Sequence, residues 1–361
     1  MAQPHILLKK IVPELIELYE KRYTILRNIY TFQPIGRRAL ASCLGLGERV
    51  VRNETDFLRN AGFLDIGPSG MRVTVEGESL LENLKDFTHK LRGLHELETK
   101  LVEIFGLQHA VVVPGDVDED PLVLKDIGKA AAKYLKSIIT GGNIIAVTGG
   151  STVGAVADAL SATHGRTNIV VVPARGGMGK NVEYQSNVIA SIFAKKLGGQ
   201  YKLLHIPDQL RAESMETLMN EPDIKSVIEN LKNADILIYG IGRAQDMMQR
   251  RNFPPSLQQA LEKMGAAAEA FGYFFNAKGE IVYACNSIWL NMDNLKRIPK
   301  LIGVAGGRQK AQAIVAVLTH WRNGVFVTDE GAAREILQLV KDQELQRKEM
   351  DVVPYNDVRK A

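Results

Sequence analysis

The stretch that decides the fold is residues 144–156, with the sequence IIAVTGGSTVGAV. Its first four residues are apolar and predict a buried parallel strand, and the small residues after them predict a turn that opens a helix. Such a turn leaves backbone N–H groups at the positive end of the helix dipole, and its glycines let an anion approach them. Ser151 and Thr152 add hydroxyl donors. We therefore predict a phosphate-binding turn at Gly149, Gly150, Ser151 and Thr152.

The same alternation of short apolar runs and helical patterns continues along the chain. Apolar runs lie at 109–114, 143–148, 168–173, 201–206, 234–240, 300–305 and 323–328. Helical patterns lie between most of them, at 122–139, 152–162, 186–198, 213–232, 309–319 and 330–341. This alternation is typical of an α/β protein whose parallel sheet has helices on both faces. We predict a doubly wound, Rossmann-like domain with an inserted hairpin formed by residues 267–276 and 280–288.

The first part of the chain is helical and basic. Residues 37–45 predict a short helix that ends on a glycine, and residues 48–60 predict a second helix after a tight turn. Residues 64–75 then predict a strand, a turn and a strand. Two helices joined by a tight turn and followed by a hairpin form a winged helix-turn-helix, which is a DNA-binding unit.

The spacing on the second of these helices separates two faces. The inward stripe is Val50, Val51, Phe57 and Leu58, and the outward face is Arg49, Arg52, Asn53 and Asp56. We expect base edges in the major groove to be contacted by Arg49, Arg52 and Asn53. We expect DNA phosphates to be bound by Arg37, Arg38 and, from the wing, Arg72.

A further apolar stripe connects the two parts of the chain. Its members are Leu84, Phe87, Leu91, Leu94, Leu97, Leu101 and Ile104, at spacings of mostly three and four. The stripe predicts one linker helix, from 84 to 105, that pairs with a second copy of the chain or packs on its own domain. The predicted domains are a winged-helix domain with the start of this helix (1–88), an effector-binding and oligomerisation domain (89–341) and a charged, flexible tail (342–361).

Size and composition narrow the class of protein. A chain of 361 residues exceeds one ordinary core, which indicates two domains, and a net charge of +4 does not by itself indicate nucleic acid. No apolar run approaches the roughly 18–20 residues that cross a bilayer, and the start of the chain lacks a signal-peptide pattern. The 2 cysteines exclude a disulfide framework, so we expect a cytoplasmic protein. No Cys/His group has metal-ligand spacing, so no metal site is expected.

In doubly wound sheets, ligands bind beyond the carboxyl ends of the strands. This rule selects a second glycine-rich turn, Gly306–Lys310, beside the first one. Two such turns at helix starts suit a ligand with anionic groups, and the charges can come from Arg175, Arg250, Arg251 and Lys310. Each feature also has a purely structural interpretation, since glycines after a strand can serve close packing and arginines can be solvated surface residues.

Two classes of enzyme compete with a regulator. A nicotinamide-dependent dehydrogenase fits poorly, because Ser151 stands where G-x-G-x-x-G requires its second glycine and the next strand ends in Arg175. A sugar-phosphate isomerase or deaminase needs a carboxylate or histidine base. Candidate carboxylates near predicted strand ends are Asp116, Asp118, Glu183, Asp208 and Glu269. This alternative stays open, although an isomerase has no evident need of an amino-terminal winged helix.

The order of four features resembles that in the SorC-type sugar-binding transcriptional regulators. These features are the helix-turn-helix at 37–56 and the turns at 148–152, 175–177 and 306–310. The resemblance covers nearly the whole chain. It implies a repressor of glycolytic genes without catalytic residues, whose effector domain is similar to sugar-phosphate isomerases. The implied effector, in place of a cofactor, is fructose 1,6-bisphosphate. The implied assembly is a homo-oligomer, a dimer that forms a tetramer on operator DNA.

The resemblance also implies roles for individual residues. One phosphate group would be bound by Gly149, Gly150, Ser151 and Thr152 with Lys310. The other would be bound by Arg175, Arg250 and Arg251. The sugar hydroxyls would be bound by Gln185 and Glu269.

Overall fold

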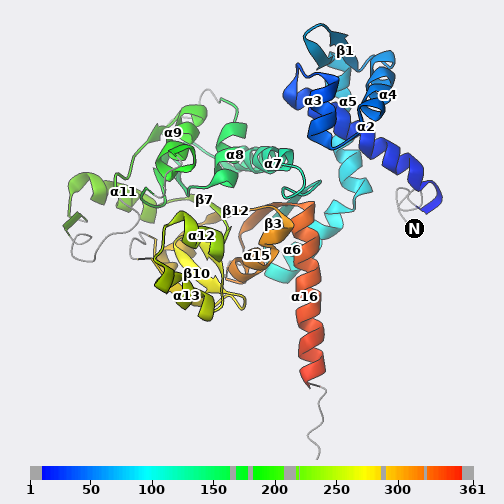
Figure 1. The fold of residues 1–361 in the computed structure, drawn as a ribbon. Helices are drawn as coiled ribbons and strands as arrows, with labels where there is room; N and C mark the ends of the chain where they lie inside the picture. The colour runs from blue at the N-terminus through cyan, green and yellow to red at the C-terminus, as the bar shows by residue number, and fades with distance from the viewer. Residues whose placement is uncertain are drawn as a thin grey trace, which may run out of the picture. The chain divides into compact units, whose positions relative to one another are not determined.

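A computed structural model describes residues 10–162, 168–177, 182–206, 217–218, 220–285, 290–320 and 323–351, with side chains up to residue 345. The chain forms two compact units, Met1–Gly93 and Leu94–Ala361. The boundary between them lies after Gly93, a few residues beyond the predicted residue 88. Helices and a small hairpin build the first unit, and a large sheet with helices builds the second (Figure 1).

The first unit is a winged helix-turn-helix, as predicted. Its elements are, in order, α2 (Pro13–Phe32), α3 (Arg37–Leu44), α4 (Glu48–Asn60), β1 (Leu64–Gly67), β2 (Gly70–Val73) and α5 (Val75–Leu91). Helix α3 ends because Gly45 takes the left-handed conformation, with φ 62°, and its N–H bonds back to the helix. The antiparallel pair β1 and β2 forms the wing.

The buried face of α4 is narrower than predicted. Val51, Thr55 and Leu58 are buried, whereas Val50 and Phe57 are 38% and 45% exposed. The guanidinium carbon of Arg22 lies 3.5 Å from the centre of the Phe57 ring, so a cation from α2 covers this ring in place of the core. The prediction that Val50 and Phe57 face inward is therefore wrong, because both lie on a flank of α4 that the core does not reach.

The predicted linker helix is two helices. Gly93, with φ 66°, interrupts the helical backbone between α5 and α6 (Leu94–Phe105). The stripe is accordingly divided between the units: Phe87 packs edge-on against Tyr19 of α2, and the second unit buries the leucines at 94, 97 and 101. The prediction of one continuous helix is wrong. In the second half of the stripe these three leucines pack on their own domain, whereas Ile104 is exposed.

The second unit contains a parallel sheet of seven strands in the order β3-β13-β12-β7-β4-β5-β6. The strands are β3 (His109–Val113), β4 (Ile144–Val147), β5 (Val170–Pro173), β6 (Gln200–Tyr201), β7 (Ile236–Gly240), β12 (Lys300–Val304) and β13 (Val325–Asp329). Each strand overlaps one of the predicted apolar runs. The doubly wound α/β fold is therefore confirmed.

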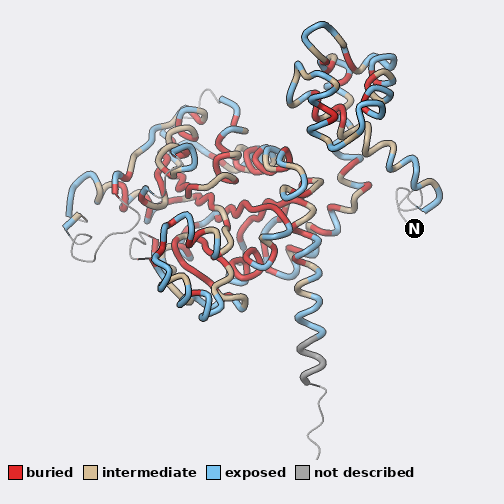
Figure 2. Tube along the Cα trace, viewed as in Figure 1, coloured by how far each residue is buried: buried red, intermediate tan, exposed pale blue. Residues whose placement is uncertain are grey.

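Helices cover both faces of this sheet. One face packs against α7 (Leu122–Ile138), α8 (Ser151–Ala159) and α9 (Ser186–Leu197). The other face packs against α6, α11 (Pro222–Lys232), α14 (Met292–Arg297), α15 (Ala311–Leu318) and α16 (Glu330–Asp351). Along β7, Ile236 and Ile238 enter the first core while Leu237 and Tyr239 enter the second, as the two-residue period of a strand requires. Figure 2 shows the buried residues gathered along these strands.

The predicted hairpin is part of a four-stranded antiparallel sheet in the order β11-β10-β9-β8. Its strands are β8 (Gly242–Arg243), β9 (Ala266–Ala270), β10 (Tyr273–Asn276) and β11 (Ile281–Ala284), with α12 (Ala244–Arg250) and α13 (Pro255–Lys263) between the first two. The single strand predicted for 267–276 is wrong, because the chain reverses at Phe271 and Gly272, which both have positive φ. Residues 286–288 of the second predicted strand lie outside the described residues.

The end of the chain is more ordered than predicted. Helix α16 continues to Asp351, since residues 342–351 are mostly good helix formers, and the prediction of a flexible tail is wrong for them. Residues 352–361 lie outside the described part of the chain. None of the described helices is long and apolar enough to cross a membrane.

Candidate functional site

A cavity of about 410 Å³ lies at the carboxyl ends of β4 and β7. These strands are neighbours, although the chain runs from β4 outward to β5 and β6 before it returns to β7. A reversal of strand order of this kind is where doubly wound sheets bind ligands. The cavity is lined by Thr148, Gly149, Gly150, Ser151, Thr152, Val153, Ala174, Arg175, Tyr184, Gly240, Ile241, Gly242, Asp246, Met247, Gln249, Arg250, Asn252, Glu269, Phe271, Leu290 and Lys310.

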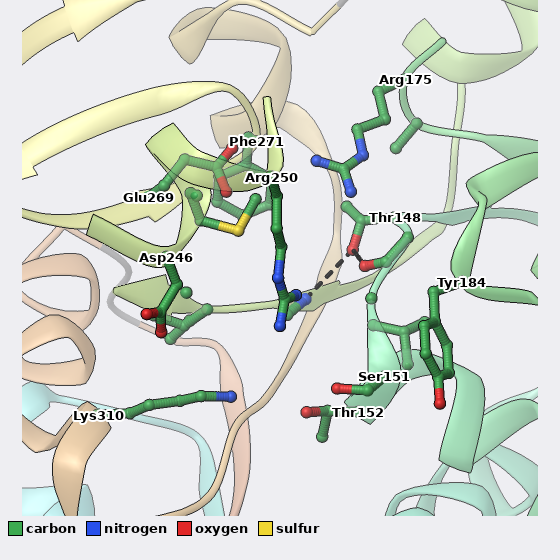
Figure 3. A pocket seen from close by; sticks show the side chains of 18 of the residues that line it. Thr148, Ser151, Thr152, Arg175, Tyr184, Asp246, Arg250, Glu269, Phe271 and Lys310 are labelled. Carbon is green, nitrogen blue, oxygen red and sulfur yellow. Dashed lines mark hydrogen bonds between the residues drawn. The ribbon is translucent and has the colours of Figure 1, made fainter. Parts of the chain in front are cut away.

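The turn before α8 forms one wall of this cavity (Figure 3). Gly150 has a φ of 116°, which suits only glycine, and no side chain caps the start of the helix. A Cβ atom at Gly149 would lie 2.5 Å from the carbonyl oxygen of Tyr184 and 2.9 Å from Nη2 of Arg175. The glycine thus lets the Arg175 guanidinium lie against the turn. Within the described residues, the hydroxyls of Ser151 and Thr152 form no hydrogen bond, so they can donate to an anion at the helix start.

Two of the cations that line the cavity are Arg250 and Lys310. Neither Arg250 nor Lys310 forms an ion pair within the described part of the chain. Burial lowers the pKa of Lys310 and the positive charge of Arg250 lowers it further, which outweighs the opposite effect of the carboxylates of Asp118, Asp246 and Asp329. An anion bound between them would relieve this repulsion and stabilise the charged lysine. The arrangement therefore favours an anionic ligand.

The second glycine-rich turn differs from the first. The N–H of Gly307 donates to Asp329 Oδ2 at 2.8 Å, and the N–H of Gln309 donates to Asp118 Oδ2 at 2.9 Å. A Cβ at Gly307 would lie 2.7 Å from the Asp118 carboxylate. Protein carboxylates therefore occupy the place that an external anion would take. The expectation of two glycine turns that bind anions is wrong here, because this turn offers the cavity only its Lys310 side chain.

Eight of the ten residues predicted to bind the effector line the cavity, whereas Gln185 and Arg251 do not. Gln185 is the N-cap residue of α9. The Arg251 side chain is 0% exposed and donates to Glu269 Oε1 at 2.8 Å. The same oxygen accepts the N–H of Gly272 at 2.8 Å, and the other oxygen of Glu269 accepts no hydrogen bond within the described residues. Arg251 thus lies behind Glu269 as its counter-ion.

Several lining residues were not predicted from the sequence, and Asp246 and Phe271 matter most among them. Arg243 donates two hydrogen bonds to Asp246, at 2.8 and 2.9 Å, and they hold the pKa of this carboxyl below its usual value. Their spacing of three at the start of α12 is a signal that could have identified the pair. Phe271 had no signal, since an aromatic residue next to a glycine resembles part of a strand.

The predicted isomerase bases are mostly engaged elsewhere. Asp116 pairs with Arg308, and Asp118 accepts a backbone N–H as described above. Glu183 is exposed on a 3-10 turn and does not line the cavity, and Asp208 lies outside the described residues. Within the described part of the chain, no group of three His, Cys, Asp or Glu side chains could hold a metal ion.

The predicted DNA-contacting residues lie on the outer faces of the first unit. Arg49, Arg52 and Asn53 are exposed on α4, and Arg72 is exposed on β2 of the wing. Arg38 is exposed and pairs with Glu48 at 2.9 Å. Arg37 differs, because it donates to Asp56 and Thr55 and so joins α3 to α4. Arg37 would contact a DNA phosphate only if its guanidinium released Asp56 and Thr55.

Known protein families and relatives match both units of the chain. The family model for the CggR N-terminal DNA binding domain matches residues 18–88, and a model described as a sugar-binding domain matches residues 89–338. The chain is 42% identical to the central glycolytic genes regulator of Bacillus subtilis (strain 168) over 330 residues, which are 91% of this chain and 97% of that protein. It is 32% identical to the transcriptional regulator LsrR of Escherichia coli (strain K12) over 261 residues, which are 69% of this chain and 79% of that protein.

Solved structures give the same result. The crystal structure of a regulator from Enterococcus faecalis, assigned to the SorC family, aligns with a TM-score of 0.64 and 38% identity, covering 67% of this chain and 100% of that one. The full-length sorbitol operon regulator SorC from Klebsiella pneumoniae aligns with a TM-score of 0.62 over 88% of this chain and 98% of that one. At 21% identity this second likeness concerns the fold alone.

Proposed function

Because the chain belongs to the SorC-type family of sugar-binding transcriptional regulators, we propose that it represses glycolytic genes in the cytoplasm and that fructose 1,6-bisphosphate controls its binding to operator DNA. A DNA-binding domain and a sugar-binding domain lie in one chain. The regulator of Bacillus subtilis to which the chain is similar is named for central glycolytic genes. The observation that supports the effector is the pair of cations, Arg250 and Lys310, which line the cavity and form no direct ion pair within the described residues.

The positions of the charges support a ligand with two phosphate groups. Figure 3 draws Lys310 on the side of Ser151 and Thr152, whereas Arg175 lies on the side of Thr148, and Arg250 lies between them. One phosphate would take the amides and hydroxyls at the start of α8 together with Lys310. The other would be bound by Arg175 and Arg250. A volume of about 410 Å³ leaves room for a sugar between them, whose hydroxyls can donate to the open oxygen of Glu269.

An isomerase or deaminase is the weaker proposal. Among the described residues, the two carboxylates that line the cavity are each bound to an arginine, Asp246 to Arg243 and Glu269 to Arg251. The hydrogen bonds from Arg243 lower the pKa of Asp246, away from the neutral range in which a general base works best. The relatives from Bacillus subtilis and Escherichia coli described above are named as regulators and not as enzymes.

Control of DNA binding requires that the effector bind one arrangement of the subunits more tightly than another. We propose a dimer that forms a tetramer on operator DNA, and an effector that loosens the contacts between dimers. A ligand with equal affinity for both arrangements would change nothing, however tightly it bound.

The test uses the full chain, titrated by calorimetry with fructose 1,6-bisphosphate, fructose 6-phosphate and fructose, and assayed in parallel for operator binding by gel shift. We expect the bisphosphate to bind more tightly than the monophosphate, because it engages both groups of cations, and fructose not to bind. We expect the same bisphosphate concentrations to weaken the operator complex. Equal affinity for fructose, an operator complex that ignores the bisphosphate, or turnover of a sugar phosphate would refute the proposal.

Arg52→Ala is expected to weaken binding to the specific operator by about 1–3 kcal/mol and to relax the preference for a base, because an exposed arginine on the recognition helix can donate two hydrogen bonds to a guanine. Arg72→Ala is the matched control on the wing. It should weaken binding to all sequences alike and reduce the salt dependence by about one ion. Binding to randomised duplexes measures both effects, and an unchanged base preference would remove Arg52 from the readout.

A further inference from the structure

The turn between β9 and β10 has an unusual residue at its first position. Ala270 pairs with Tyr273, so Phe271 and Gly272 alone form the connection. Their φ values, 58° and 89°, have the signs of a type I′ turn, which favours Asn-Gly because both central residues need positive φ. A bulky aromatic residue rarely takes this conformation. Phe271 is therefore strained in a way that asparagine at the same place would not be.

The surrounding structure holds this turn in place on both sides. Glu269 Oε1 accepts the Gly272 N–H at 2.8 Å and is itself fixed by the buried Arg251. The Phe271 ring lies 4.4 Å from the ring of Tyr239, centre to centre. Tyr239 can occupy that place because a Cβ at Gly303 would lie 2.9 Å from its hydroxyl oxygen. Strained residues persist where neighbours determine their position in this manner, and they are concentrated at functional sites.

Phe271 lines the cavity at the carboxyl ends of β4 and β7. Hydroxyls, cations and carboxylates line part of the cavity, and a sugar bisphosphate also has a carbon skeleton that must leave water. The other sizeable apolar side chains on the described lining are Val153, Ile241, Met247 and Leu290, and Tyr184 adds a second aromatic ring. Aromatic and apolar walls with a few placed polar groups are the general form of sites for small ligands. Figure 3 draws Phe271 beside Glu269, the residue with an open oxygen for hydroxyls.

We infer that Phe271 is a specificity residue, kept in a strained turn so that its ring forms the apolar wall against the carbon skeleton of the sugar phosphate. This inference rests on the proposed function for the identity of the ligand. The strain, in contrast, depends on the backbone alone. The role of the ring predicts that Phe271→Asn weakens ligand binding, because the ring is removed. The strain predicts that asparagine fits the turn better than other residues without the ring.

The experiment compares Phe271→Asn with Phe271→Ala in the full chain, because both remove the same ring and differ in their tolerance of positive φ. We expect the asparagine variant to unfold about 2–4 °C above the alanine variant. We expect both variants to bind fructose 1,6-bisphosphate about tenfold more weakly than wild type, by calorimetry. Phe271→Tyr, which keeps the ring, should bind within about twofold of wild type.

The unfolding temperatures test the strain in the turn, and the binding affinities test the role of the ring. Equal unfolding temperatures for the asparagine and alanine variants would show that the turn is not strained. An asparagine variant that binds as tightly as wild type would remove the ring from the binding site, while the proposed function would stand. If the wild-type chain itself fails to bind the bisphosphate, the proposed function fails and the role of the ring with it, and the unfolding temperatures still decide the strain.

Discussion

Arg251→Met is expected to lower the free energy of unfolding of the second unit by about 3–5 kcal/mol, the usual effect of removing one partner from a buried ion pair. The side chains of Arg251 and Glu269 are 0% and 5% exposed, and their charged atoms lie 2.8 Å apart. Methionine fills similar space but leaves the Glu269 carboxylate buried without its counter-ion. Because this carboxylate also accepts the Gly272 N–H, the β9–β10 turn would be disturbed as well. Denaturant unfolding of the full chain measures the loss.

Arg297→Met is the matched control, because it removes an exposed arginine from the same unit. It should change the free energy of unfolding by less than about 0.5 kcal/mol. The double variant Arg251→Met with Glu269→Gln should recover part of the loss, since the amide still accepts the Gly272 N–H but carries no buried charge. Arg251→Met protein that is as stable as wild type would show that the pair does not support the fold.

Arg250→Met, one residue earlier, is expected to leave the fold intact and to weaken binding of fructose 1,6-bisphosphate about ten- to hundredfold. Arg250 is exposed, lines the cavity and has no ion pair within the described residues, so its removal costs the unliganded protein little. A hydrogen bond to a charged group contributes about 1.5–3 kcal/mol, which corresponds to this loss of affinity. Calorimetry measures the affinity, and operator binding should then need correspondingly more effector for release.

The same Arg297→Met chain serves as the control, because it loses an equal charge at a place outside the cavity and should bind the bisphosphate as wild type does. If Arg250→Met binds the bisphosphate normally, the ligand does not occupy this cavity. A large loss of stability in Arg250→Met would contradict the division of roles between the two neighbouring arginines.

The sequence predicted the sheet well and the inserted hairpin poorly. Parallel strands covered on both faces are mostly apolar, so the runs that became β3, β4, β5, β7, β12 and β13 could be recognised without knowing their partners. The exposed edge strand β6 (Gln200–Tyr201) shares only Tyr201 with its predicted run. The reversal at Phe271 could not, because its residues lack the usual Asn-Gly signal and neighbours such as Tyr239 and Glu269 hold the turn. The prediction of one linker helix was wrong for a similar reason. Its stripe is continuous in sequence, but Gly93 divides it between two cores.

By itself the sequence determined the winged helix-turn-helix, the doubly wound sheet and the glycine turn before α8, since local patterns of apolar residues, glycines and hydroxyls are sufficient for each. Only the tertiary structure decided which glycine turn keeps its amides for a ligand and which of two adjacent arginines faces the cavity. Both decisions depend on carboxylates from distant parts of the chain: Asp118 and Asp329 occupy the second turn, and Glu269 binds Arg251. A charge or an amide can bind a ligand only if no protein group has already taken it, and that depends on the folded neighbours.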